Sequence, residues 1–132
     1  MRLNEKQKRE ILNAAHAFLG SPYGSEFDCI GFIRAVYKSA DIDIPKIFPL
    51  EAPSYEFNIS KEELGGAPEG SIIFLKDRYD PRHERKWTHA VIALCGGQCI
   101  HNSVFYGLRV TVSDMKTILK ERYDFAESIS PP

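Results

Sequence analysis

The chain has 132 residues, which is enough for one domain with a single hydrophobic core. Hydrophobic residues make up 43% and charged residues 27%, with a net charge of −1, so the composition indicates a soluble globular protein and gives no sign of a nucleic-acid partner. No apolar run approaches the roughly 20 residues of a membrane span. Residues 1–10 are charged and lack the apolar core of a signal peptide. We therefore expect one domain over 1–132, cytoplasmic in the producing cell, with its three cysteines reduced.

Two amphipathic helices are predicted in the N-terminal third. The first begins after Asn4, with Gln7 placed to complete a capping box, and ends near Gly20. A turn-rich segment follows, and the second helix is expected from Cys29 to about Ala40, with Asp28 as its N-cap. Its isoleucine and valine residues recur at helical spacing, which predicts a face buried in the core.

The rest of the chain changes from loop to strands. Four prolines punctuate residues 45–68, which we interpret as a loop over the domain, with a short helical turn at Ser60–Leu64. Five mainly antiparallel strands are then expected: Ser71–Leu75, Thr88–Cys95, Cys99–Val104, Gly107–Val112 and Tyr123–Ile129. Ser113 is expected to cap a short helix that runs to Lys120. Helices followed by antiparallel strands are typical of the α+β class.

Cys29 is the first candidate for chemistry. It falls in the first turn of the second helix, where free N–H groups and the helix dipole favour an anion, so we expect a thiol of lowered pKa. A lowered pKa is what makes a cysteine nucleophilic at neutral pH. The alternative is a buried structural cysteine, which is the commoner role of a free cysteine.

Two histidines on neighbouring strands offer a base and its partner. A cysteine nucleophile needs a base within hydrogen-bond reach, and the base needs a third group that orients it. His89 opens one strand, and His101 lies on the next. A three-residue turn at Gly96–Gln98 would pair His101 with Ala93, about 13 Å from His89 at ~3.3 Å per residue. Direct contact between the histidines therefore requires a shifted register or a bulge.

The charged segment 76–87 precedes His89. Its Arg82 and Arg85 are either part of a solvated hairpin or overhang the cleft, where they would bind a substrate carboxylate. Cys95, Cys99 and His101 could instead form a metal site together with His89, but their spacing fits no common zinc pattern well. We expect no metal and no cofactor.

Taken in order, the motifs resemble the NlpC/P60 family of cysteine peptidases. The resemblance rests on Leu19–Gly24, Phe27–Ile33, Ile44-Pro45, Pro68–Phe74, His89–Ala93 and Ile100–Ser103. It implies a papain-like core, with N-terminal helices packed on a mainly antiparallel five-stranded sheet. It also implies that Cys29 is the nucleophile, His89 the base and His101 the orienting residue, and that Tyr23 and Asp28 take part in substrate binding.

The resemblance further implies a substrate class. Members of the family usually cut cell-wall stem peptides after a γ-linked D-glutamate. Such a protein without a leader would need a phage or specialised secretion route, or would have lost its leader, and an inhibitor or immunity protein would be a fitting partner. The sequence departs from the family pattern at three places, which bear on the substrate more than on the chemistry. They are Ile30 in place of the usual serine, a short Tyr23–Cys29 link and Ser71 in place of an aspartate. Acyl transfer and an inactive binding module remain alternatives.

Overall fold

The structure, a computed structural model, describes residues 3–43, 57–58, 68–81 and 87–130. Two of the interpretations above, the helical turn at Ser60–Leu64 and the cationic pair Arg82 and Arg85, lie outside these residues.

Both N-terminal helices begin at the caps that the sequence predicts. Helix α1 (Glu5–Ala17) starts with the Asn4–Gln7 capping box. Helix α2 (Cys29–Lys38) starts at Asp28, whose carboxylate accepts a hydrogen bond from the Gly31 N–H at 2.8 Å. This cap places Cys29 at the first helical position, as expected. The helix ends two residues before the predicted Ala40.

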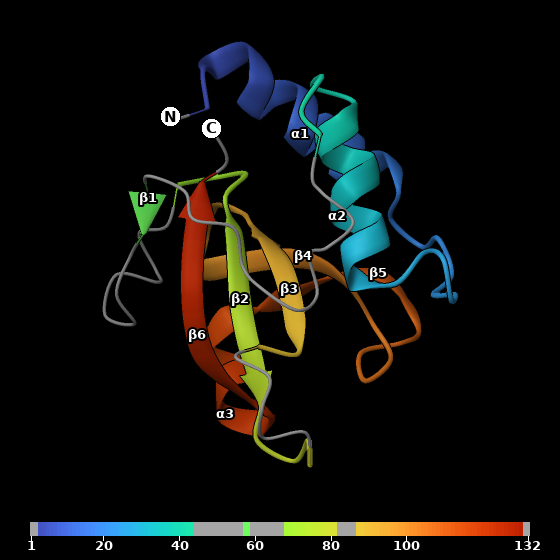
Figure 1. The fold of residues 1–132 in the computed structure, drawn as a ribbon, viewed down its shortest axis with the longest axis vertical. Coiled ribbons are helices and arrows are strands. Elements are labelled where there is room, and N and C mark those ends of the chain that lie inside the picture. Colours follow the sequence, from blue (N-terminus) through green and yellow to red (C-terminus); the bar gives the residue numbers. More distant parts are fainter. Residues whose placement is uncertain (1–2, 44–56, 59–67, 82–86, 131–132) are drawn as a thin grey trace.

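The five predicted strands form one antiparallel sheet, to which a two-residue strand adds at the edge. The bounds are β1 (Phe57–Asn58), β2 (Ile72–Asp77), β3 (His89–Ala93), β4 (Gln98–Ser103), β5 (Arg109–Asp114) and β6 (Tyr123–Ser130). Their order across the sheet is β1-β6-β2-β3-β4-β5. Figure 1 shows α1 and α2 together beside this sheet, which confirms the α+β class.

The last helix, α3 (Met115–Glu121), starts one residue later than predicted. Asp114, and not Ser113, is its N-cap, and the Asp114 carboxylate accepts a hydrogen bond from the Lys116 N–H at 3.0 Å. The expected cap was wrong because β5 continues through Asp114, so Ser113 is still a strand residue. Its hydroxyl is therefore free to meet a group on the neighbouring strand.

Side chains that alternate along the strands build a core on each face of the sheet. Ile72, Phe74 and Ile92 pack on one face with α1 and α2, whereas Ile73, Leu75 and Val91 pack on the other face with α3. The two faces together make β2 and β3 almost wholly buried. The sheet is thus a rigid support for polar groups at its strand ends.

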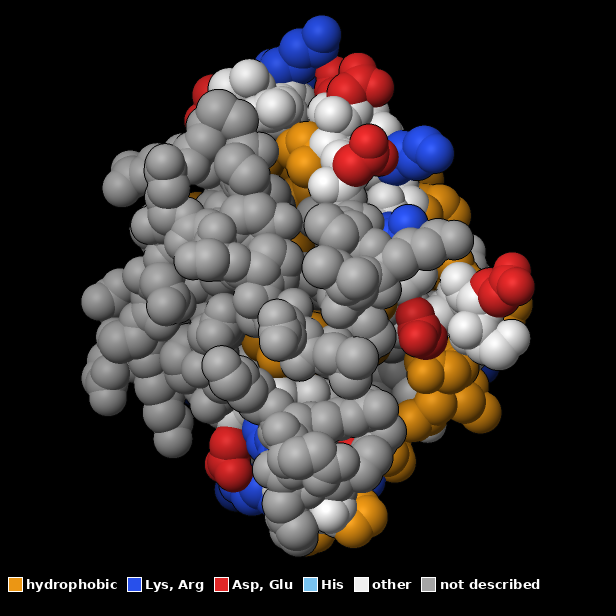
Figure 2. Space-filling view, viewed as in Figure 1, with side chains coloured by type: hydrophobic (Ala, Val, Ile, Leu, Met, Phe, Trp, Pro, Cys, Tyr) orange, Lys and Arg blue, Asp and Glu red, His pale blue; other side chains and the backbone are white. Residues whose placement is uncertain are grey.

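The outer surface of α1 is charged. Figure 2 shows Lys, Arg, Asp and Glu side chains gathered at the end of the molecule where Figure 1 places this helix. Two of these pairs lie at helical spacing, Lys6–Glu10 at 3.9 Å and Lys8–Glu5 at 3.4 Å. In the described part of the chain, no helix combines the length and the apolar character needed to cross a membrane.

Candidate active site

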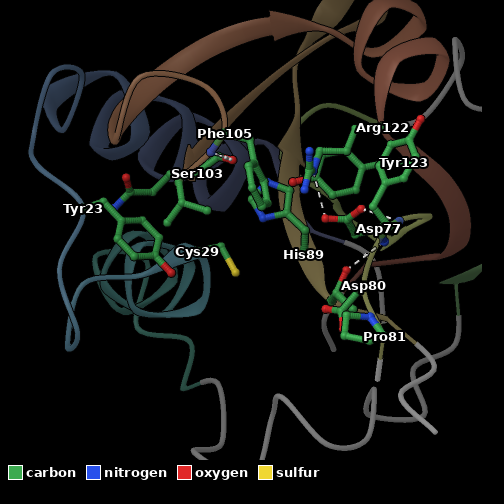
Figure 3. A pocket seen from close by; sticks show the side chains of 14 residues that line it. Tyr23, Cys29, Asp77, Asp80, Pro81, His89, Ser103, Phe105, Arg122 and Tyr123 are labelled. Atoms are coloured by element: carbon green, nitrogen blue, oxygen red, sulfur yellow. Dashed lines mark hydrogen bonds and ion pairs between the residues drawn. The ribbon is translucent and has the colours of Figure 1, made fainter. Parts of the chain in front are cut away.

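Cys29 lies in a cleft of about 480 Å³ that also contains His89 and Tyr23. Figure 3 shows these three side chains around the open space between the start of α2 and the end of the sheet. The remaining described residues of the lining are Asp77, Tyr79, Asp80, Pro81, Thr88, Asn102, Ser103, Val104, Phe105, Arg122 and Tyr123. The structure thus brings the predicted nucleophile, the predicted base and one predicted substrate-binding residue to one site.

Asp28 has a different place from the one expected of a substrate-binding residue. Its carboxylate is engaged by the Gly31 N–H as the helix cap, and it is not among the described residues that line the cleft. Its charge still acts on the site, because it raises the pKa of both Tyr23 and Cys29. Asp28 therefore contributes to the start of the helix and to the local field.

Three polar side chains form a hydrogen-bonded row behind the cleft. His89 Nε2 lies 2.8 Å from His101 Nδ1, and His101 Nε2 lies 2.8 Å from Ser113 Oγ. Both histidines are almost fully buried. The ring of Tyr123 stacks on His89 with centroids 5.1 Å apart, and Figure 3 shows it on the side of His89 opposite to Cys29. The predicted contact between His89 and His101 is present.

The contact depends on a register shift of two residues. Ala93 pairs with Cys99, where the three-residue turn would have paired it with His101. The turn begins one residue earlier than predicted, because the Leu94 N–H donates to the Gln98 carbonyl at 2.8 Å and Gly96 and Gly97 both adopt positive φ. Glycine tolerates that conformation without steric cost. Moving the turn back brings His101 about 6.6 Å closer to His89 along the strand.

Burial keeps both imidazoles neutral. It lowers the pKa of His101 to about 4, and burial together with the neighbouring His101 lowers the pKa of His89. A neutral imidazole has one N–H and one acceptor nitrogen. If His101 donates from Nε2 to Ser113, its Nδ1 must accept from His89 Nε2, which leaves His89 Nδ1 as the free acceptor for a thiol proton. In this tautomer the row from His89 to Ser113 has a proton arrangement that suits a general base.

The thiol itself does not have the low pKa that we expected from the helix start. The pKa of Cys29 is raised to about 12, mainly by burial and in smaller part by the Asp28 carboxylate, and the N–H groups of Ala90, Ile30 and Cys29 only partly offset this. Loss of hydration around the partly buried Cys29 outweighs the effect of the helix N-terminus here. The resting pair is consequently a neutral thiol beside a neutral imidazole.

Cys29 and His89, both of them described, are not hydrogen-bonded to each other in this resting arrangement. Cys29 belongs to the α2 side of the sheet, whereas His89 shares the face of Val91. His89 reaches the same cleft because it is the first residue of β3. Catalytic hydrogen bonds are often long before substrate binds and shorten in the complex.

Sequence reasoning missed three groups of the site. Ser113 accepts or donates the last hydrogen bond of the histidine row. Asn102 Nδ2 donates to the Phe27 carbonyl at 2.7 Å and so connects the loop before Cys29 to β4. Arg122 lines the far wall of the cleft. The sequence placed Ser113 just after a strand, as a helix cap, and its contact with His101 depends on the pairing of β4 with β5. In the described ranges, no three histidine, cysteine or acidic side chains are grouped to hold a metal.

Comparison with known proteins places this site in a family. The model of the NlpC/P60 family matches residues 17–126. No curated protein matches the chain. The NlpC/p60 domain of the peptidoglycan hydrolase SagA is 26% identical, with a TM-score of 0.64, and the match covers 97% of this chain and 99% of that one.

Two further solved structures share the fold at lower identity. NlpC1 from Trichomonas vaginalis is 22% identical, with a TM-score of 0.72 and coverage of 98% of this chain and 45% of that one. A lipoprotein-like NLP/P60 family protein from Staphylococcus aureus is 21% identical, with a TM-score of 0.68 and coverage of 100% and 44%. The chain thus spans less than half the length of these two proteins. Because the family model matches most of the chain, the chain belongs to the NlpC/P60 family.

Proposed function

We propose that this chain is a cysteine amidase or peptidase that hydrolyses an amide bond in peptidoglycan stem peptides, of the γ-D-glutamyl–diamino acid type. The observation that carries the proposal is the meeting of Cys29 and His89 in one cleft, with His89 hydrogen-bonded to His101. Membership of the NlpC/P60 family, and the likeness to a domain of a peptidoglycan hydrolase, support this substrate class.

The reaction begins with attack on the substrate carbonyl. Cys29 Sγ forms a bond to the carbonyl carbon while its proton passes to His89 Nδ1. The carbonyl oxygen becomes an oxyanion, which the Cys29 backbone N–H at the helix start is placed to stabilise. His101 orients the imidazole, and Ser113 accepts a hydrogen bond from His101 Nε2 in the tautomer that this scheme requires.

The second half of the reaction releases both products. The amide C–N bond breaks as His89 returns its proton to the leaving amine, and a thioester remains on Cys29. Water then attacks the thioester with His89 as base, which gives a free carboxylic acid and restores the thiol. A neutral resting pair suits this scheme because the proton moves only when the carbonyl is in place.

The test is incubation with defined muropeptides, followed by mass analysis of the fragments. A mass gain of one water across the γ-D-glutamyl bond is expected, and Cys29→Ala and His89→Ala should abolish it with the fold intact by circular dichroism. Fragments that carry an added amine in place of water would show that the reaction is acyl transfer and not hydrolysis. An intact substrate under all conditions would overturn the proposal.

A further inference from the structure

The far wall of the cleft holds an arginine whose position the reaction scheme does not use. Arg122 follows α3, and its side chain lines the same cleft as Cys29 and His89. It is the only lysine or arginine among the described lining residues. Figure 3 shows it between Phe105 and Asp77, on the side of His89 opposite to Cys29.

Contacts on three sides fix the guanidinium of Arg122. Its Nε donates to Asp77 Oδ2 at 2.8 Å, and Asp77 is in turn held by the Tyr79 N–H, which donates to Oδ1 at 2.8 Å. The guanidinium carbon lies 3.3 Å from the ring centroid of Phe105 and 5.5 Å from that of Tyr79. The group is therefore oriented before any ligand arrives, which reduces the entropy lost on binding.

The same contacts leave most of its donors unused. A guanidinium has five N–H donors, and within the described part of the chain only Asp77 accepts one from this group. The Arg122 side chain keeps 27% of its surface exposed, whereas that of Asp77 keeps 7%. Phe105 is half exposed even though it covers one face of the guanidinium. The unused N–H groups have the fork geometry that binds a carboxylate through two parallel hydrogen bonds, and the side chain that carries them is partly exposed in the cleft.

From this geometry we infer that Arg122 is a specificity-determining residue that binds a free carboxylate of the peptide substrate. The inference rests on the proposed function, which supplies a matching group: a glutamate linked through its γ-carboxyl keeps its α-carboxylate free. Asp77 orients Arg122, and Phe105 forms the platform beneath it. Arg82 and Arg85, which the sequence suggested for this role, lie outside the described residues.

The experiment compares two peptides that differ only in this group. One carries γ-linked D-glutamate with a free α-carboxylate, and the other carries the α-carboxamide. We expect the protein to prefer the free acid, and Arg122→Met to raise KM for the acid by at least about tenfold while the carboxamide is unaffected. Arg78→Met is the matched control, since Arg78 pairs with Asp124 at 3.6 Å and is not in the lining.

Two additions keep the result decisive. Because Arg122→Met leaves the buried Asp77 unpaired, the double variant Asp77→Asn/Arg122→Gln, with a neutral pair, repeats the comparison if the single variant does not fold. Calorimetric binding of both peptides to Cys29→Ala, with and without Arg122→Met, tests recognition even if neither peptide is cut. Equal losses for acid and carboxamide, or a preference that survives both variants, would overturn the inference. Absence of cleavage together with an Arg122-dependent binding preference would overturn only the proposed reaction.

Discussion

His101 is the residue on which the protonation of the base depends. Its Nδ1 meets His89 and its Nε2 meets Ser113, so the position of its single proton decides whether His89 Nδ1 is free to accept the thiol proton. We expect His101→Gln to keep much of the activity, because its amide still offers an acceptor to the His89 N–H. His101→Ala should lose roughly 10²-fold in kcat, the scale of a misplaced general base. Equal losses in both variants, with the fold intact, would count against an orienting role.

Ser113 gives a finer test of the same row. We expect Ser113→Ala to lower kcat several-fold and to change its pH profile, and Ser113→Thr to restore both, because only the hydroxyl contacts His101. Thr111→Val is the control on the same strand, since the Thr111 hydroxyl makes no hydrogen bond to His101 in the described structure. A kcat that does not respond to Ser113→Ala would remove Ser113 from the mechanism.

The Cys29 thiol should behave as a weak acid in the free protein. With its pKa raised to about 12, alkylation of Cys29 by iodoacetamide should be slow at pH 7 and rise about tenfold per pH unit up to about pH 10. Asp28→Asn should accelerate labelling at each pH, because asparagine keeps the cap and removes the charge that opposes the thiolate.

Peptide mapping separates this thiol from the others. The exposed Cys95 should be labelled before Cys29 at neutral pH, and the buried Cys99 last. A labelling rate for Cys29 that is already constant above pH 6 would mean that the resting site holds a thiolate after all.

At the scale of elements, the approach of the 24–28 loop to α2 positions the nucleophile. A Cβ built at Gly31 would lie 2.5 Å from the Glu26 carbonyl oxygen, whereas one at Gly24 would meet nothing within 4 Å. Gly31→Ala should therefore push this loop away and destabilise the protein by about 1–3 kcal/mol.

Denaturant unfolding of both alanine variants tests this account. Gly24→Ala should be close to wild type, and Gly31→Ala should also lose activity beyond its loss of stability, because Phe27 in the displaced loop is tied to Asn102 of the cleft. Similar stabilities for the two variants would show that the loop can move without cost.

At the scale of the whole molecule, the buried histidine pair links stability to pH. Because the pKa of His101 falls from 6.5 to about 4 on folding, and that of His89 is also lowered, the unfolded chain binds protons that the native state does not. Stability should be full above pH 6.5 and fall by about 1.4 kcal/mol per pH unit for each histidine as the pH decreases toward 4.

The variant His101→Gln isolates this effect. Wild type and His101→Gln are unfolded in urea at a series of pH values. Between pH 6.5 and 4, the free energy of unfolding of the variant should fall by about 1.4 kcal/mol per pH unit less than that of wild type, because its unfolded chain binds one proton fewer. The difference between the two slopes cancels the contribution of the carboxylates. Parallel slopes would mean that His101 titrates alike in the folded and unfolded states.

The sequence by itself determined the three helices, the strands β2 to β6 and their order along the chain. Caps such as Asn4 and Asp28 act through hydrogen bonds to residues three positions away, and the strand pattern from Ile72 onward has a period of two, so both are readable locally. The choice of Cys29 and His89 followed from the same local signals and from motif order. These features needed no knowledge of which strand lies beside which.

Only the tertiary structure decided how the side chains of the site meet. The start of the turn before Gly96 set the register that joins His101 to His89, and strand pairing then brought in Ser113. Desolvation reversed the expected pKa shift of Cys29, because the loss of water depends on every wall of the cleft and not on the helix alone. Arg122 lies in the cleft because of how α3 packs. It is too far from Cys29 and His89 along the chain for a local sequence pattern to predict this.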